Sequence, residues 1–274
     1  MYQYKLIATD LDGTLLDSKG RLSEENKKAL RALDEKGVYL SIATGRTYSE
    51  IPAEVLACEA FRYCIYANGA TVLDRKSGEK MNACIPNAVI GKMMDIFADY
   101  ELHITARAEG ECYYDAKYPL AENEAYYRID PNHVSCVGRY GVAKEDFDRF
   151  VRSWEGAEVF SVYFHDDKER AECKERLLAL GSVYVTSICD TNFEIFDLAA
   201  GKDKALLRLA SHLGVKEKEV MTLGDSGNDM AMTKAAGLGL ATANAQDILV
   251  AVSDGRICSN DEHVMQFILE KYFS

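Results

Sequence analysis

The sequence lacks the features that would direct it to a membrane, to nucleic acid or out of the cell. None of its apolar runs is long enough to cross a lipid bilayer. It has no run of lysine and arginine, and its 44 acidic and 32 basic side chains give a net charge of −12. Lys5, Asp10 and Asp12 interrupt the apolar start that a signal peptide needs. We therefore expect a cytoplasmic protein that binds neither membranes nor nucleic acid.

The eight cysteines lack the spacing of a zinc site or of a redox pair. No two of them form a Cys-x-x-Cys pair, and they lie in apolar runs such as residues 183–189. We expect reduced and mostly buried thiols, as in the cytosol. With 274 residues, of which 48% are hydrophobic, the chain can form a sizeable core and more than one domain.

The strongest chemical signal is the stretch Ala8–Asp17. A short apolar segment, residues 4–8, predicts a buried strand, and Asp10, Asp12 and Gly13 follow it. Two carboxylates at the end of a buried strand are costly unless a cation lies beside them. A divalent metal ion, most simply Mg²⁺, meets that need and leaves positions for water and a phosphate. Asp-Gly also favours turns in any protein, so the stretch needs support from the rest of the chain.

In such a site the two carboxylates can have different tasks. Asp10 can attack phosphorus and carry the phosphoryl group as an aspartyl-phosphate. Asp12 can give a proton to the leaving oxygen and later take one from water.

Two further predicted strands also end in small polar residues. Ser23 is expected to cap a helix that ends at Gly37, and residues 38–43 and 63–67 then form buried strands. Because the carboxyl ends of parallel strands meet at one edge of a sheet, the residues that follow them are candidate ligands of a phosphate. The predicted phosphate-binding residues at these two ends are Thr44, Gly45, Arg46 and Asn68.

Three of these four residues also have simpler structural interpretations. Thr44 can cap the next helix instead of holding a phosphoryl oxygen. Arg46 can pair with a phosphate or with an acid of the core. Asn68 precedes a glycine, and Asn-Gly is a common hairpin turn.

Residues 84–190 have a different pattern, in which hairpins alternate with helices. They contain none of the strand-end carboxylates. They predict an inserted α+β cap domain that closes over the crevice of the core. The core is then formed by residues 1–83 and 191–274, and residues 192–197 are expected to be a strand that leads back into it.

A second acidic motif follows the apolar segment 220–223. Asp225 is the natural second metal ligand beside Asp10. Asp229 is expected to orient metal-bound water or a lysine without binding the metal. Asn228 can donate a hydrogen bond to the phosphate or to the rest of the substrate.

The order of these motifs resembles that of the haloacid dehalogenase superfamily, in its Cof-type branch with a large α/β cap. The resemblance implies an Asp10 nucleophile and a Mg²⁺ ion held by Asp10, Asp225 and the backbone carbonyl of Asp12. The family lysine matches Lys202, although Asp203 stands where glycine is usual and Lys204 is an alternative. Such a lysine offsets the repulsion between Asp10 and an incoming phosphate.

The predicted fold class is α/β, with a doubly wound and mostly parallel Rossmann-like sheet and an inserted α+β cap. The predicted function is a Mg²⁺-dependent phosphatase that hydrolyses small phosphorylated metabolites, sugar phosphates first, through an aspartyl-phosphate. A sugar phosphomutase of the same superfamily is one alternative. A non-catalytic phospho-acceptor or binding protein is another, and Asp12 argues against it. We expect a monomer or a weak homodimer.

Overall fold

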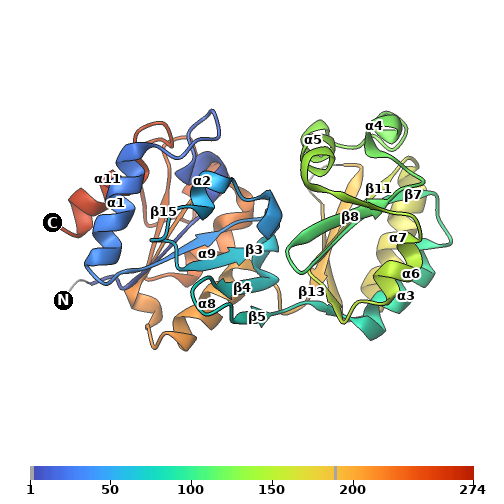
Figure 1. Cartoon of the computed structure of the whole chain (residues 1–274), viewed down its shortest axis with the longest axis horizontal. Helices are drawn as coiled ribbons and strands as arrows, with labels where there is room; N and C mark the ends of the chain where they lie inside the picture. The colour runs from blue at the N-terminus through green and yellow to red at the C-terminus, as the bar shows by residue number, and fades with distance from the viewer. Residues whose placement is uncertain (1–2, 188–189) are drawn as a thin grey trace. The chain divides into compact units, whose positions relative to one another are not determined.

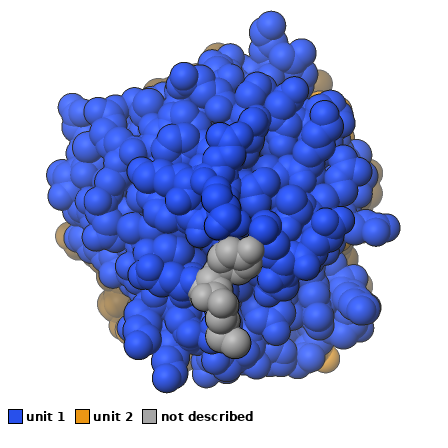
Figure 2. Space-filling model, turned by 90° about the vertical axis from the view of Figure 1, so that its left-hand side faces the viewer, with its two compact units in different colours: residues 1–46, 51–82, 201–274 blue, residues 47–50, 83–200 orange. Residues whose placement is uncertain are grey.

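The computed structural model of the chain describes residues 3–187 and 190–274 (Figure 1). The chain divides into two compact units, coloured blue and orange in Figure 2. The first unit contains residues 1–46, 51–82 and 201–274, and the second contains residues 47–50 and 83–200. Among the described residues, each helix is too short or too polar to span a lipid bilayer.

The first unit is built on an eight-stranded sheet in the order β16-β15-β14-β1-β2-β3-β4-β5. The strands from β16 to β3 are parallel, and β4 and β5 continue the sheet antiparallel. The sheet order reverses at β1, which lies between β14 and β2, and such a reversal is where open α/β sheets bind ligands. The strands are β1 (Leu6–Thr9), β2 (Tyr39–Ala43), β3 (Tyr63–Tyr66), β4 (Thr71–Asp74), β5 (Lys80–Asn82), β14 (Val220–Gly224), β15 (Leu238–Ala241) and β16 (Gly255–Arg256).

Helices and short helical turns connect these strands. α1 and α11 pack against each other, and so do α8 and α9. The helices are α1 (Glu24–Glu35), α2 (Ala53–Leu56), α8 (Lys202–His212), α9 (Met230–Ala235), α10 (Asp247–Val250) and α11 (Val264–Tyr272). The turns are η1 (Leu11–Leu15), η3 (Ala67–Gly69), η4 (Glu217–Glu219) and η5 (Gly227–Asp229).

Local sequence explains where α1 begins and what it buries. The Ser23 hydroxyl accepts a hydrogen bond from the Asn26 N–H at 3.2 Å, as expected of an N-cap. Leu30 and Leu33 are fully buried, so one face of the helix packs on the core. Gly37 follows the helix with a φ of +79°, which confirms the predicted stop.

The second unit has a six-stranded sheet in the order β12-β13-β11-β7-β8-β9 and a two-stranded β10-β6 pair. Helices α3, α6 and α7 bury their apolar residues against one face of the large sheet. The strands are β6 (Ile85–Pro86), β7 (Leu102–Ala108), β8 (Glu111–Asp115), β9 (Val142–Lys144), β10 (Gly156–Ala157), β11 (Val159–Phe164), β12 (Val183–Thr186) and β13 (Asn192–Asp197). The helical segments are η2 (Tyr48–Glu50), α3 (Asn87–Phe97), α4 (Leu120–Asn123), α5 (Pro131–Tyr140), α6 (Phe147–Arg152) and α7 (Asp167–Ala179).

Residues 192–197 form a strand, as predicted, but this strand lies in the second unit and not in the core. This strand, β13, pairs antiparallel with β11 and β12 in the sheet of the second unit. The apolar pattern of these residues predicts a strand but does not predict which strand it pairs with, because the backbone hydrogen bonds between strands do not depend on particular side chains. The apolar run 183–189 contains β12, which ends at Thr186, and residues 188–189 lie outside the described part of the chain.

The cysteines for which the structure gives a state are free thiols. Three of them are buried, and burial raises the pKa of Cys64 and of Cys173 to about 12. Such thiols are poor nucleophiles. Cys189 lies outside the described residues.

Candidate active site

The end of β1 carries the buried acid that is the predicted nucleophile. All four residues of β1 are buried, and Asp10 follows them with only 5% of its surface exposed. The Asp10 N–H donates a hydrogen bond to the Leu223 carbonyl of β14 at 3.0 Å. The sheet therefore holds the backbone of Asp10 beside the strand that leads to Asp225.

Gly13 allows the turn after β1 to lie directly against Asp225. It has a φ of +76°, which glycine adopts without strain. A Cβ at this position would come within 2.5 Å of Asp225 Oδ2. This close approach also brings the next residue, Thr14, within reach of Asp225, and its hydroxyl donates a hydrogen bond to Asp225 Oδ1 at 3.2 Å.

Lys202 is the ammonium group that reaches Asp10. Its Nζ donates to Asp10 Oδ1 and to Asp229 Oδ1, both at 2.7 Å, and its side chain is 1% exposed. It is the first residue of α8, and Arg208 of that helix donates a hydrogen bond to the Gly69 carbonyl in η3 at 2.9 Å. The structure thus selects Lys202 over Lys204, which is exposed.

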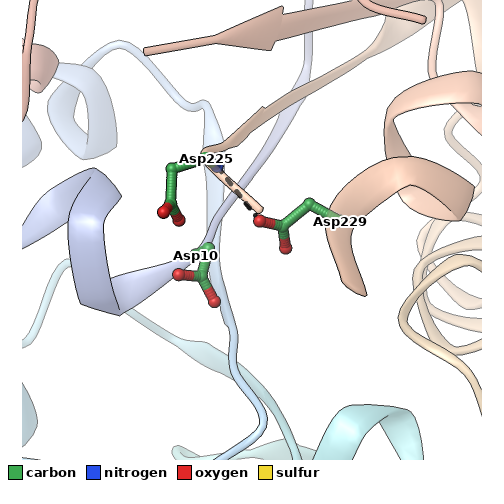
Figure 3. Close-up of side chains that lie close together, drawn as sticks. All are labelled: Asp10, Asp225 and Asp229. Atoms are coloured by element: carbon green, nitrogen blue, oxygen red, sulfur yellow. Dashed lines mark hydrogen bonds between the residues drawn. The ribbon is translucent and has the colours of Figure 1, made fainter. Parts of the chain in front are cut away.

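The end of β14 contributes Asp225 and Asp229. Asp229 is fully buried, and its Oδ2 accepts hydrogen bonds from the backbone N–H groups of Asp225 and Ser226 at 3.1 and 3.2 Å. Figure 3 shows the carboxylates of Asp10, Asp225 and Asp229 gathered in one place, and one oxygen of each lies within 4.8 Å of the others.

The electrostatics of this cluster favour a bound cation. Burial raises the pKa of Asp10 to about 7, although Lys202 opposes the shift. Burial and the nearby Asp229 raise the pKa of Asp225 from 3.8 to about 6. Burial alone would lower the pKa of Lys202, but the attraction of Asp10 and Asp229 raises it. Three carboxylates and one ammonium leave an excess of negative charge, which a cation would neutralise.

The donor atoms fit a hard divalent cation. Both oxygens of Asp229 already accept hydrogen bonds, one from Lys202 and the other from two backbone N–H groups. Asp10 has one oxygen that Lys202 does not bind. Within the described part of the chain, the Asp225 carboxylate accepts one side-chain hydrogen bond, from the Thr14 hydroxyl. Carboxylate oxygens of this kind are the ligands that Mg²⁺ and Ca²⁺ prefer.

Replacing Asp225 by asparagine should stabilise the metal-free protein. Because the folded-state pKa of Asp225 is about 6 and its ordinary value is 3.8, its ionisation costs stability as the pH rises through this range. In EDTA at pH 8, D225N should therefore melt at a higher temperature than the wild type. The increase should be about 2 to 4 °C for each kcal/mol that the substitution adds to the free energy of unfolding. The gain should shrink at pH 5, where the wild-type carboxyl is already protonated.

Differential scanning calorimetry at the two pH values measures this difference. The control is D34N, which changes an exposed aspartate of α1 and should leave the melting temperature unchanged. A D225N variant that melts below the wild type at pH 8 in EDTA would contradict the electrostatic interpretation.

Asp12 does not join the three clustered carboxylates. Its side chain is 55% exposed and pairs with Arg46, whose Nε and Nη2 lie 2.8 Å from its two carboxylate oxygens. The sequence left the partner of Arg46 open, and in this structure the partner is an acid of the first unit.

The remaining predicted phosphate-binding residues lie close to one another. The buried Thr44 hydroxyl accepts a hydrogen bond from the Arg46 N–H at 3.1 Å. A Cβ at Gly45 would come within 3.0 Å of Asn68 Oδ1, and Asn228 Nδ2 donates to the same oxygen at 3.4 Å. Asn68 also lies in the turn between β3 and β4, with a φ of +50°, so the hairpin interpretation is correct as well.

Two residues at the site were missed by sequence reasoning. Thr14 belongs to the Asp-x-Asp-Gly-Thr string, and its hydroxyl could have been considered as a donor to Asp225. Asn244 donates a hydrogen bond from Nδ2 to the Gly13 carbonyl at 2.8 Å. Its position in the loop after β15 gives no local signal, because its partner is 231 residues away.

The fold and this site define a doubly wound α/β enzyme that carries a carboxylate cluster at the switch point of its sheet. Comparison with protein families makes the identification specific. Residues 7–268 match the model of the haloacid dehalogenase-like hydrolases, and the chain belongs to this family.

Individual relatives agree with this assignment. The chain is 31% identical to the 5-amino-6-(5-phospho-D-ribitylamino)uracil phosphatase YcsE of Bacillus subtilis, over 91% of this chain and 88% of the relative. It is 29% identical to the phosphatase YwpJ of the same organism, over 94% and 96% of the two chains. A solved haloacid dehalogenase-like hydrolase from Bacteroides thetaiotaomicron superposes with a TM-score of 0.80 at 26% identity, over 98% of this chain and 100% of that one.

These findings confirm three predictions. The chain is a Cof-type member of the haloacid dehalogenase superfamily. Its fold is the expected α/β class, with a Rossmann-like core and a cap. It is an enzyme, a phosphomonoester hydrolase.

Proposed function

We propose that this enzyme is a Mg²⁺-dependent phosphatase of small phosphorylated metabolites that works through an aspartyl-phosphate on Asp10. The observation that carries the proposal is the buried Asp10 carboxylate, held by Lys202 at 2.7 Å beside Asp225. A sugar-like phosphate is the first substrate class to test. The name of one relative specifies a phosphoribityl compound, in which the phosphate is carried by a sugar alcohol.

Asp10, Asp225 and the backbone carbonyl of Asp12 would hold the metal ion. When bound, Mg²⁺ would neutralise the charge of the phosphate and of the two carboxylates, so that both can approach. Asp229 would act as a positioning residue, because its oxygens hold Lys202 and the backbone N–H groups of the Asp225 turn.

In the first step, Asp10 attacks phosphorus while the ester bond to the alcohol breaks. Lys202 orients the Asp10 carboxylate and favours its ionised form. Asp12, protonated once it has left Arg46, gives its proton to the leaving alcohol oxygen. To reach that oxygen, Asp12 has to leave Arg46, and its departure frees the guanidinium group to pair with the phosphate.

In the second step, Asp12 takes a proton from a water molecule that attacks the aspartyl-phosphate. The new oxygen–phosphorus bond forms as the bond to Asp10 breaks, and inorganic phosphate leaves. Thr44, Asn68 and Asn228 are the donors proposed to hold the phosphoryl oxygens during both steps.

Removing the metal ion should abolish phosphate release from a panel of phosphorylated metabolites. Bound cations contribute several kcal/mol to the stabilisation of phosphoryl transition states, so EDTA should lower the rate at least about 100-fold and Mg²⁺ should restore it. Ca²⁺ is the control, because its larger coordination shell should support little activity. Phosphate release that is insensitive to EDTA would contradict the proposed metal dependence.

Product analysis separates the two alternatives in the same assay. If hexose phosphates yield an isomer and no free phosphate, the enzyme is a mutase. If the chain keeps a stable phosphoryl group after incubation with a donor, it is a phospho-acceptor.

A further inference from the structure

The loop after β15, residues 242–246, contacts both of the turns that carry the acids. On the Asp225 side, the Thr242 N–H donates to the Gly224 carbonyl at 3.1 Å, and the Gln246 N–H donates to the Asp225 carbonyl at 2.8 Å. The Gln246 side chain adds a second link, since its Oε1 accepts a hydrogen bond from the Gly227 N–H at 3.2 Å.

On the Asp10 side, the Thr242 hydroxyl donates to the Gly13 carbonyl at 3.5 Å, and the loop makes a shorter contact with the same carbonyl through the side chain of Asn244. Its Nδ2 donates to the Gly13 carbonyl at 2.8 Å, and its Oδ1 accepts a hydrogen bond from the Asn260 N–H at 3.0 Å. The Asn260 side chain in turn donates to the Leu16 carbonyl at 2.9 Å. Asn244 and Asn260 thus hold the turn after β1 at two points.

The hydrogen bond to Gly13 also affects Asp225. The Gly13 carbonyl belongs to the same planar peptide unit as the Thr14 N–H and Cα, so a hydrogen bond that holds the carbonyl also holds the backbone from which the Thr14 side chain extends. The Thr14 hydroxyl donates to Asp225 Oδ1 at 3.2 Å. One short loop therefore joins the Asp10 turn to the Asp225 turn, whose carboxylates would repel each other when ionised.

We propose that Asn244, assisted by Gln246, is a positioning residue that sets the separation of the two turns and thereby the affinity for the metal ion. The inference rests on the proposed function, because it assumes that Asp10 and Asp225 bind a cation. Both side chains are exposed, so truncating them removes hydrogen bonds without leaving a cavity in the core.

The test is Mg²⁺ binding to the full chain, measured by isothermal titration calorimetry without substrate. N244A should raise the Mg²⁺ dissociation constant about 3- to 10-fold. Loss of a residue that directly orients a metal ligand typically weakens metal binding about 10- to 100-fold, and Asn244 acts less directly. Q246A should raise it less, because the Gln246 backbone N–H still donates to Asp225. The matched control is N82A, an exposed asparagine of β5 at the far side of the sheet from β15.

Melting temperatures in EDTA distinguish positioning from a general structural role. A structural role would lower the melting temperature of N244A and leave its Mg²⁺ dissociation constant at the wild-type value, and that result would overturn the inference. A wild-type dissociation constant in both N244A and Q246A would also overturn it. If the wild-type chain itself binds no Mg²⁺, the proposed metal site fails and the inference fails with it.

Discussion

Asp10→Asn should release phosphate at least about 10⁴-fold more slowly than the wild type. The side chain keeps its size, but the amide oxygen is a poor nucleophile and cannot form the acyl-phosphate. Loss of a covalent nucleophile removes nearly all of the chemistry that the other groups assist. The proposed Mg²⁺ site would also lose one of its two carboxylate ligands.

Stability should not account for this loss. The raised pKa of Asp10, about 7, means that its ionised form is costly in the metal-free fold, and the amide removes that cost. D10N should therefore melt no lower than the wild type in EDTA at pH 8. The matched control is again D34N, which should keep full phosphate release. A D10N variant with wild-type activity would show that another group attacks phosphorus.

Lys202→Met should lower phosphate release by about 10² to 10³-fold. Methionine approximates the length of lysine but has no charge, so Asp10 loses the ammonium group that holds it at 2.7 Å. A phosphate dianion would then approach an uncompensated carboxylate, and preorganised charges of this kind are large terms in catalysis. The matched variant is K204M, which removes an exposed lysine two residues away and should keep the activity.

The same substitution should also make stability depend on pH. Lys202 is the buried partner of both Asp10 and Asp229, and removal of one member of a buried ion pair costs on the order of 3 to 5 kcal/mol. Without the ammonium group, the pKa of Asp10 should rise further, so K202M should lose stability as the pH rises from 5 to 8. Urea denaturation at the two pH values measures this loss. A K202M variant that is as stable and active as K204M would reassign the functional lysine.

The ends of the central strands were predictable because burial and polarity change abruptly there. An apolar run that stops at Asp10, Thr44 or Asp225 identifies the end of a strand whatever its neighbours are. Parallel connections then bring these ends to one edge of the sheet. The helix cap at Ser23 was predictable for a similar reason, since its hydrogen bond reaches only three residues along the chain.

Partners that are distant in sequence were not predictable. The pairing of Arg46 with Asp12 depends on how two loops meet, and the sequence allowed a phosphate as well. Residues 47–50 belong to the second unit although they directly follow Arg46. Within that unit, the Ser49 N–H donates a hydrogen bond to the Gly110 carbonyl. The pattern of side chains does not predict this backbone contact.

The sequence by itself determined the family resemblance, the order of the motifs and the set of acids at the sheet edge, because these follow from local runs of apolar and polar residues. Only the tertiary structure decided which lysine reaches Asp10, which sheet contains β13 and how Asn244 holds the turn after β1. These contacts join residues up to 231 positions apart. Their geometry is fixed by backbone hydrogen bonds and packing, which the local pattern of residues does not encode.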